Sequence, residues 1–405
     1  MTSRIIPPAG PARTLALAQF TNSVGDGAFY VTSALFFTRV VGLSPAQIGL
    51  GLTLGWGVGM LAGIWLGQLA DRHGPRRVAT ALAVATATAI SAFLVVRSYP
   101  LFIAAAIVYA VCQCGLTAAR QALLAGTIDP TRRTEVRAHL QSTLNAGLAV
   151  GAALGGLALQ LDTAAAYLAV FAVDAIGFLG CALILRAAPA VPGAALAAGE
   201  PRMAVLHDRP YAVVALLNMV LQLHIPLINL AIPLWIVQRT SAPTAMVSTL
   251  LVLNTMGVVL FQVRLARRVT DLRTATRSIR HGGAILLAAC TAFALTAAGA
   301  SPWVAATVLL GAATLQVLGE MLHSAGTYAV SFDLAPADKH GQYQGFFGSG
   351  FAIARMLGPL LLTTMILTWG TSGWLTLGAL FLAAGIAMGP AVRWAERTRA
   401  LPVPA

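Results

Sequence analysis

Long apolar runs recur along the whole chain and are separated by short polar connections. A helix needs about 20 apolar residues to cross the roughly 30 Å hydrocarbon core of a bilayer. Since only helices and closed barrels satisfy their backbone hydrogen bonds in lipid, runs of this length predict membrane-spanning helices. We expect twelve, over residues 14–38, 45–70, 76–96, 101–127, 139–160, 164–185, 211–237, 244–265, 280–299, 303–330, 342–367 and 371–392.

The composition excludes a soluble domain. Apolar residue types make up 58% of the chain and charged types 10%, and the mean hydropathy is +0.79. We therefore predict an all-α, polytopic membrane protein. We expect no cleavable signal peptide, because residues 1–13 hold three prolines and only a short apolar stretch. All four cysteines fall within apolar runs, so we expect no disulfides.

The net charge is +13, and the basic residues lie unequally on the two sides of the predicted membrane. If both termini lie on one side, most of the 26 Lys and Arg residues lie on that side too. By the positive-inside rule this side is cytoplasmic, so we expect a cytoplasmic (inner) membrane protein with both termini inside. The basic residues then orient the protein in the membrane and interact with anionic lipid headgroups. They give no reason to expect nucleic-acid binding.

One long connection, residues 187–209, is rich in proline and glycine and divides the predicted spans into two sets of six. We expect an N-terminal tail over 1–13, a six-helix bundle over 14–186, a cytoplasmic linker over 187–209, a second bundle over 210–393 and a C-terminal tail over 394–405. A faint repeat between the halves is typical of transporters built from two bundles.

The predicted hairpin between spans 2 and 3 reads Gly67-Gln-Leu-Ala-Asp-Arg-His-Gly-Pro-Arg-Arg77. Gly and Pro make the turn, and the arginines are planar bidentate donors. Two interpretations are open: a basic turn that only fixes topology, or a latch that stabilises one conformation. The residues of the predicted latch are Gly67, Asp71, Arg72, Gly74, Arg76 and Arg77.

The twelve spans, the central linker and this hairpin motif together resemble the major facilitator superfamily, over essentially the whole chain. The resemblance implies two six-helix bundles related by pseudo-two-fold symmetry and transport by alternating access. It also adds Asp129, at the end of span 4, as a partner for Arg72 or Arg76 in the latch. The nearest branch is the twelve-span drug/proton antiporters, and the Ala- and Arg-rich composition is typical of a high-GC bacterium.

Span 5 resembles the antiporter motif Gly-x3-Gly-Pro-x2-Gly-Gly, with Ala152 where the motif has proline. Small residues at this spacing let two helix backbones approach closely. The contact could be static packing or a sliding seam between the halves. The matching residues are Gly147, Gly151, Gly155 and Gly156.

Ionisable residues inside spans need explanation, because a charge at the bilayer centre costs at least about 2.5–3.5 kcal/mol. Asp26 lies between two glycines in span 1 and is either a proton carrier or the permanent ion-pair partner of Arg120. Arg120 resembles the family's span-4 arginine. It either stabilises the ionised form of Asp26 in one conformation, or it has a structural role, in which it extends toward the cytoplasmic surface or holds the hairpin in place. We expect Asp174 to be hydrogen-bonded within its bundle.

Glu320 is the carboxylate deep in the second half. The resemblance implies that it takes part in binding a proton or a cationic substrate. His323 lies three residues on, so the two either act together or form a satisfied core pair. Arg355 could pair with Glu320 or line the cavity. The predicted substrate cavity comprises Asn22, Asn218, Gln222, Asn229, His323 and Arg355, to which Asn254, Gln262 and Gln316 could add.

The sequence holds no Gly-rich loop ending in Gly-Lys-Ser/Thr, no His-x3-His pair and no nucleophile elbow, so we expect no enzyme activity, cofactor or metal. The leading hypothesis is proton-coupled efflux of a lipophilic or cationic small molecule. An uptake symporter or uniporter is the alternative, suggested by Ala152, and a non-transporting receptor or scaffold is the third. The expected partners are a small-molecule substrate, protons and membrane lipids, and we expect a monomer.

Overall fold

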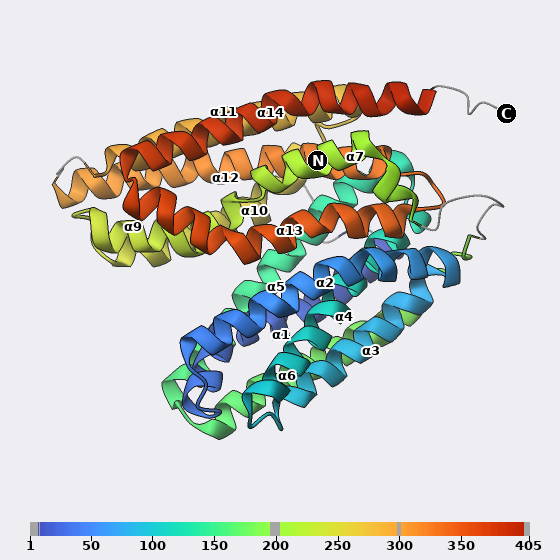
Figure 1. Cartoon of the computed structure of the whole chain (residues 1–405), viewed down its shortest axis with the longest axis horizontal. Helices are drawn as coiled ribbons and strands as arrows, with labels where there is room; N and C mark the ends of the chain where they lie inside the picture. Colours follow the sequence, from blue (N-terminus) through green and yellow to red (C-terminus); the bar gives the residue numbers. More distant parts are fainter. Residues whose placement is uncertain (1–6, 8, 195–202, 298–300, 401–405) are drawn as a thin grey trace. The chain divides into compact units, whose positions relative to one another are not determined.

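The computed structural model describes residues 7, 9–194, 203–297 and 301–400, and all regular secondary structure in these ranges is helical (Figure 1). The first half contains α1 (Pro11–Arg39), α2 (Pro45–His73), α3 (Pro75–Phe93), α4 (Tyr99–Thr127), the short η1 (Pro130–Arg132), α5 (Arg133–Leu161) and α6 (Ala164–Arg186). The second half contains η2 (Ala204–His207), α7 (Arg209–Leu221), α8 (His224–Pro226), the π-helix η3 (Leu227–Ala231), α9 (Ile232–Arg239), α10 (Ala245–Ala266), α11 (Leu272–Leu295), α12 (Pro302–Asp333), α13 (His340–Leu362), the π-helix η4 (Thr363–Thr368) and α14 (Thr371–Ala400).

Each predicted span overlaps a helix within the described residues, which confirms the all-α class. Within the described residues, eight helices are long and apolar enough to cross a membrane, and α13 with η4 forms a bent ninth. The three other predicted spans do not meet this criterion. Polar residues lower the mean hydropathy of α1, and Arg76 and Arg77 lower that of α3. The seventh predicted span is divided into short helices.

Helix boundaries follow local chemistry. Proline occupies the first turn of α1, α2, α3, α4 and α12, where its missing N–H costs nothing. Ser44 and Gln47 form a capping box at the start of α2. Gly74 separates α2 from α3 with φ 90°, a conformation that favours glycine, so the tight hairpin depends on it.

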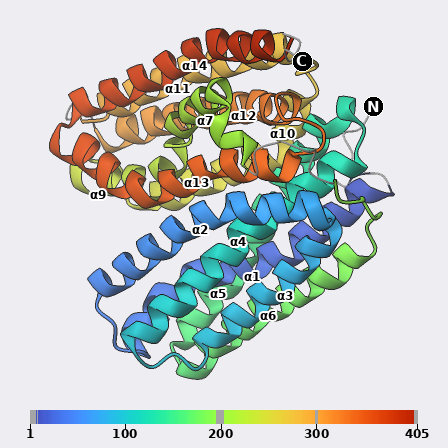
Figure 2. The ribbon, with the colours of Figure 1, turned by 45° about the vertical axis from the view of Figure 1, so that its right-hand side comes forward.

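The chain forms two compact units, and the first comprises residues 1–204 together with 335–352. In this unit α1 packs against α5 and α6, α2 against α4, and α3 against both α4 and α6 (Figure 2). Its core is an aromatic cluster in which Phe37 meets Phe102 at 4.6 Å and Phe36 meets Phe171 at 4.6 Å between ring centroids.

The second unit comprises residues 205–334 and 353–405. Here α11 packs against both α12 and α14, and α10 packs against α12. Phe293 stacks on Trp374 at 5.0 Å, and the buried Trp235 indole donates a hydrogen bond to Thr296. These aromatic contacts tie α9, α11 and α14 together.

Two predicted spans of the second unit are interrupted. α7 ends at Leu221, and the chain then passes through α8 and the π-helix η3 before α9 begins. η4 likewise replaces the end of the eleventh predicted span. Pro226 explains the first interruption in part, because proline removes a backbone donor and blocks the preceding turn. π-Helical turns are rare and occur frequently at functional sites.

The grouping of residues differs from a simple division at the linker. Residues 335–352, which include the first half of α13, cluster with the first unit. Glycines explain how closely they pack: a Cβ on Gly67 would overlap the carbonyl of Gly341, and one on Gly345 would overlap that of Gly63. The predicted tail, linker and bundle boundaries stay a proposal, and residues 195–202 of that linker lie outside the described residues.

Candidate functional site

A buried chain of polar side chains runs through the first unit. The guanidinium of Arg120 donates to the Asn22 carbonyl oxygen at 2.9 Å, and the Asn22 amide donates to Asp26 at 2.8 Å. Gln113 donates to the other Asp26 oxygen at 3.2 Å and to the Tyr109 hydroxyl at 3.0 Å. Asp26 and Arg120 are therefore connected through an amide.

Helical spacing puts these groups together. Asn22 and Asp26 are four residues apart on α1, and Tyr109, Gln113 and Arg120 are spaced four and then seven apart on α4. Each set therefore shares one helix face. The exposed fractions are 1% for Asn22 and 5% for Asp26, so the carboxylate lies in the interior and its hydrogen bonds matter. Sequence reasoning did not identify Gln113 as a site residue, although its four-residue spacing from Tyr109 was visible.

Asp174 lies beside this chain on α6. It is fully buried, and a Cβ on Gly25 would overlap its carboxyl group. Neither of its oxygens receives a hydrogen bond from any residue that the structure describes. The prediction that Asp174 is hydrogen-bonded within the bundle is therefore wrong. The small Gly25 brings α6 so close to α1 that Asp174 meets the backbone beside Asp26.

The second unit holds its own buried polar cluster around Glu320. Asn254 on α10 donates to Glu320 Oε2 at 2.8 Å, and Gln316 donates to the same oxygen at 3.3 Å. The other oxygen lies 4.0 Å from His224 Nε2. His224 Nδ1 lies 2.7 Å from the Leu221 carbonyl, to which it donates, so Nε2 carries a proton only in the imidazolium form.

Glu320 and His323 do not form the satisfied core pair that was one of the two alternatives. His323 Nε2 donates to Asn218 at 3.1 Å, while its ring lies 5.5 Å from that of His224. His224 thus lies between the two residues, because the break after α7 brings it there. Among the described residues, the interactions of Glu320 are with amides and an imidazole and include no ion pair with Arg355.

Other predicted cavity residues are less closely connected. Gln222 lies at the C-terminus of α7 and is half-buried. Gln262 donates to the backbone of α12 and acts as an interhelical link. The side chain of Asn229, in η3, lies outside the described residues. The described residues hold no group of three or more His, Cys, Asp or Glu that could hold a metal ion.

The predicted latch residue Asp71 caps a helix distant in sequence. Its carboxylate accepts hydrogen bonds from the backbone N–H of Gly341 at 2.6 Å and of Gln342 at 2.8 Å, in the first turn of α13. A carboxylate at a helix N-terminus satisfies free N–H groups and interacts favourably with the helix dipole. Gly67, one turn earlier, leaves room for this approach.

The latch cations behave differently from the expectation. Arg76 donates to the carbonyl of Ala188 at 3.0 Å, Arg77 is exposed, and the buried Nε and one terminal nitrogen of Arg72 have no partner among the described residues. Asp129 accepts from the backbone and hydroxyl of Thr131, and these bonds lower its pKa. The predicted pairing of Asp129 with Arg72 or Arg76 is therefore wrong, because a local turn satisfies Asp129.

The spaced glycines of α5 pack against a helix of the same unit, α1. Cβ atoms on Gly147, Gly151 and Gly155 would overlap α1 between Phe20 and Val31, whereas one on Gly156 would meet open space. Three of the four glycines therefore let α5 pack closely against the helix that carries Asp26.

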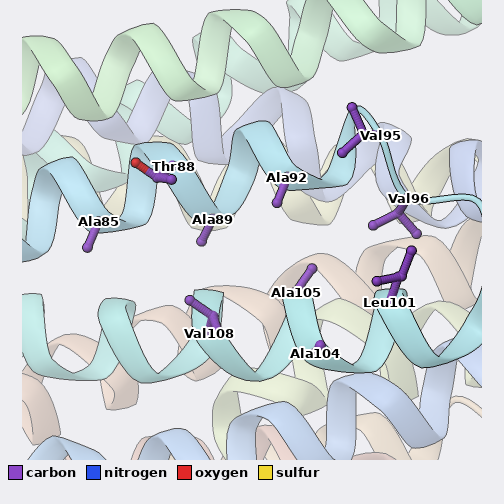
Figure 3. Close-up of a pocket in the computed structure, with 10 residues that line it drawn as sticks. All are labelled: Ala85, Thr88, Ala89, Ala92, Val95, Val96, Leu101, Ala104, Ala105 and Val108. Carbon is purple, nitrogen blue, oxygen red and sulfur yellow. The ribbon is translucent and has the colours of Figure 1, made fainter.

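A separate cavity of about 570 Å³ opens between α3 and α4 (Figure 3). Its lining is apolar apart from the Thr88 hydroxyl, and its rim residues Val95, Leu101 and Val108 are exposed. It contains none of the predicted site residues. An open, apolar groove of this kind suits lipid chains.

The sequence matches the family model of the Major Facilitator Superfamily over residues 15–359. This match covers most of the chain, and the chain belongs to this family of membrane transporters. No curated protein matches the sequence.

Solved structures share the fold. The chain is similar to the human organic anion transporter MFSD10 (TETRAN), with 15% identity, a TM-score of 0.69 and coverage of 93% of this chain and 98% of that one. It is also similar to a bacterial homologue of the iron transporter ferroportin in an outward-facing state, with 16% identity, a TM-score of 0.76 and coverage of 96% and 100%. At these identities the likeness establishes the fold, which is that of an all-helical, multi-span membrane protein. The family match identifies the chain as a secondary transporter.

Proposed function

We propose that the protein exports lipophilic or cationic small molecules in exchange for protons. The observation that supports this most directly is Asp26, a buried carboxylate linked through Asn22 to Arg120. An ionisable group inside a span is costly, and in transporters such groups form proton relays. The hydrogen-bonded chain gives this carboxylate both a cation and a route for rearrangement.

Glu320 is the second proposed coupling residue. Two amides donate to one of its oxygens and the other faces His224, and no arginine forms an ion pair with it among the described residues. A cationic substrate or a proton would supply the missing positive charge, and the two would compete. Asn218 and His323, beside it, are proposed to line the same substrate site.

Alternating access requires a device that stabilises one conformation, and we assign this role to the latch. Asp71 supplies two charge-assisted hydrogen bonds to the first turn of α13. Their loss would release that helix end without unfolding α2 or α3.

The proposal includes a topology. We place the protein as a monomer in the cytoplasmic membrane of a bacterium, with both termini and the latch inside. We place the two six-helix bundles at 14–186 and 210–393, and the linker at 187–209. Positive charge at the cytoplasmic ends would also attract anionic lipids.

The test uses everted vesicles that contain the full-length protein. Ethidium, a lipophilic cation, should drive proton release with the wild type and not with the double variant Asp26→Asn, Glu320→Gln. Asp271→Asn is the matched control, because Asp271 is an exposed N-cap and asparagine caps a helix equally well. Normal proton release from the double variant would contradict the proposal.

Uptake is the second candidate, and Ala152 favours it. α5 runs without interruption through Ala152, where the antiporter motif has a proline. Whole-cell accumulation decides the direction: an uncoupler should increase accumulation of an exported compound and abolish accumulation of an imported one. The panel should include an organic anion and an iron salt, because one similar structure is named an organic anion transporter and another a homologue of an iron transporter.

A further inference from the structure

The groove between α3 and α4 has no role in the proposed function. Small side chains create it: Ala89 and Ala92 on α3 lie opposite Ala104 on α4 and leave a volume of about 570 Å³ between the helices (Figure 3). The hydroxyl of Thr88, in its lining, already donates to the Val84 carbonyl at 3.1 Å. The groove therefore offers a ligand an almost entirely apolar surface.

The groove belongs to the part of the chain that is suited to lipid. No charged residue occurs between Arg77 and Arg97, and α4 is long and apolar enough to cross a membrane. The exposed fractions of the rim side chains are 73% for Val95, 57% for Leu101 and 51% for Val108. Exposed apolar side chains on a membrane-spanning helix face hydrocarbon, so we expect the groove to open toward lipid chains.

The length of the groove fits one leaflet of a bilayer. Its lining on α4 extends from Leu101 to Val108, which corresponds to about 10 Å of helix. The hydrocarbon core is about 30 Å thick, so each leaflet contributes about 15 Å. The groove begins at the connection between α3 and α4 and follows the helices toward the middle of the membrane. It therefore has the direction and length of an acyl chain that enters from the membrane surface.

A cation lies at the surface end of this groove. One terminal nitrogen of Arg97 donates to the carbonyl of Val96, a lining residue, at 2.7 Å and to that of Leu94 at 3.0 Å. The side chain is exposed, and its two other nitrogens make no hydrogen bond or ion pair with the described residues. The sequence from 72 to 128 contains no Asp or Glu. This guanidinium therefore has two donors available for an anion, and phosphate oxygens suit its planar geometry.

We propose that the groove binds one acyl chain of an anionic phospholipid, and that Arg97 holds the phosphate of the same lipid. The groove alone would accept any acyl chain, and the guanidinium alone would accept any anion. Together they select a molecule that carries both parts. The site is separate from the residues assigned to transport, because none of these lines the groove.

The test of the headgroup is native mass spectrometry of the purified full-length protein. The probes are phosphatidylglycerol and phosphatidylcholine with the same palmitoyl and oleoyl chains. The wild type should retain one phosphatidylglycerol about fivefold more tightly than phosphatidylcholine, the effect of one basic residue near a membrane surface. Arg97→Gln should bind the two lipids equally, and Arg97→Lys should keep part of the preference. Arg239→Gln is the matched control, because Arg239 is also exposed and donates to a backbone carbonyl.

The test of the chain site uses Ala104→Trp. Ala104 is exposed, so the indole fills the groove without displacing a buried side chain. Binding of both lipids should fall several-fold. Ala153→Trp is the matched control, because Ala153 is an exposed alanine on α5 outside the groove. Circular dichroism checks that both variants stay folded, and the Arg97 variants test the proposal independently if Ala104→Trp does not.

Four outcomes would overturn the proposal. The preference for phosphatidylglycerol could survive in Arg97→Gln, or lipid binding could be unchanged in folded Ala104→Trp. Glycerol phosphate could displace the lipid, which would make the site one for a soluble anion. The wild type could form a dimer that Ala104→Trp dissociates, which would show that a second copy covers the groove. Ethidium-driven proton release tests the proposed function separately, so a failure there leaves the lipid site standing.

Discussion

Both units bury a carboxylate, but they hold it in different ways. In the first unit Asp26 lies on continuous helices and is connected through Asn22 to the guanidinium of Arg120. In the second unit Glu320 is held by two amides and faces His224, which lies where a span is broken. The first arrangement links the carboxylate to a cation of the protein through an amide, and the second leaves a carboxylate whose charge a proton or a cationic substrate can balance.

The interruptions sharpen this contrast. The described residues have π-helical turns in the second unit, at η3 and η4, whereas the long helices of the first unit run unbroken. Glycines instead bring helices together in the first unit, as at Gly25 and Gly151. We infer that the first unit is built for close, rigid packing around its carboxyls and the second for local movement around its own.

The largest effect is expected from Arg120→Gln. Removing the cation from a buried charge network costs up to about 3–5 kcal/mol, so the thermal stability of the purified protein should fall and transport should be lost. Glu320→Gln should lower the stability much less. This substitution removes no cation from the network, and the glutamine oxygen still accepts the hydrogen bond from Asn254. Equal destabilisation by the two variants would contradict the proposed difference between the two buried carboxylates. Arg120→Lys should restore part of the loss, because it keeps the charge without the fork of donors.

Asp71→Asn should slow turnover without preventing insertion. An asparagine side chain offers one acceptor to the two N–H groups of α13, so one charge-assisted hydrogen bond of about 1.5–3 kcal/mol is lost. We expect a roughly tenfold lower transport rate at an unchanged amount of protein in the membrane. Asp271→Asn is the control, because Asp271 is exposed and lies outside the latch. Normal transport by Asp71→Asn would make the hairpin a plain topology signal.

Pro226→Ala tests whether the second unit depends on its broken span. Alanine supplies the N–H that proline lacks, so the segment after α7 should become more regular, and amide hydrogen exchange over residues 222–231 should slow several-fold. Transport should change by a smaller factor. Pro390→Ala in α14 is the matched control, because it removes a proline from a continuous helix. Unchanged exchange near His224 would contradict the inferred mobility.

The smallest effect is expected at Asp162, on the surface of the first unit. The Tyr167 hydroxyl and then Arg39 hold the pKa of Asp162 below its ordinary value. Its contribution to stability is therefore present above about pH 4, the unfolded value, and is lost as the pH falls through the lower folded value. Asp162→Asn should lower the melting temperature slightly at neutral pH, and the difference should vanish in acid. The pair is exposed, so a large effect would be unexpected.

The sequence predicted the helices and the position of the hairpin turn well, because both depend on local patterns. Runs of apolar residues determine where a chain can cross a membrane, and a glycine with positive φ determines where a hairpin turns. The sequence also identified Asp26, Arg120 and Glu320, because any charge within an apolar run is conspicuous. Their roles in transport stay predictions.

The partners of those charges were decided by the tertiary structure. Asp71 meets backbone groups 270 positions away, His224 reaches Glu320 through a broken span, and Asp174 lies against Gly25 without the hydrogen bond expected for it. The reason is physical: hydropathy and spacing describe one helix at a time, whereas the angle and depth at which two helices pack decide which polar groups meet. The sequence by itself determined a helical membrane protein with charges inside it, and only packing decided which charges are balanced.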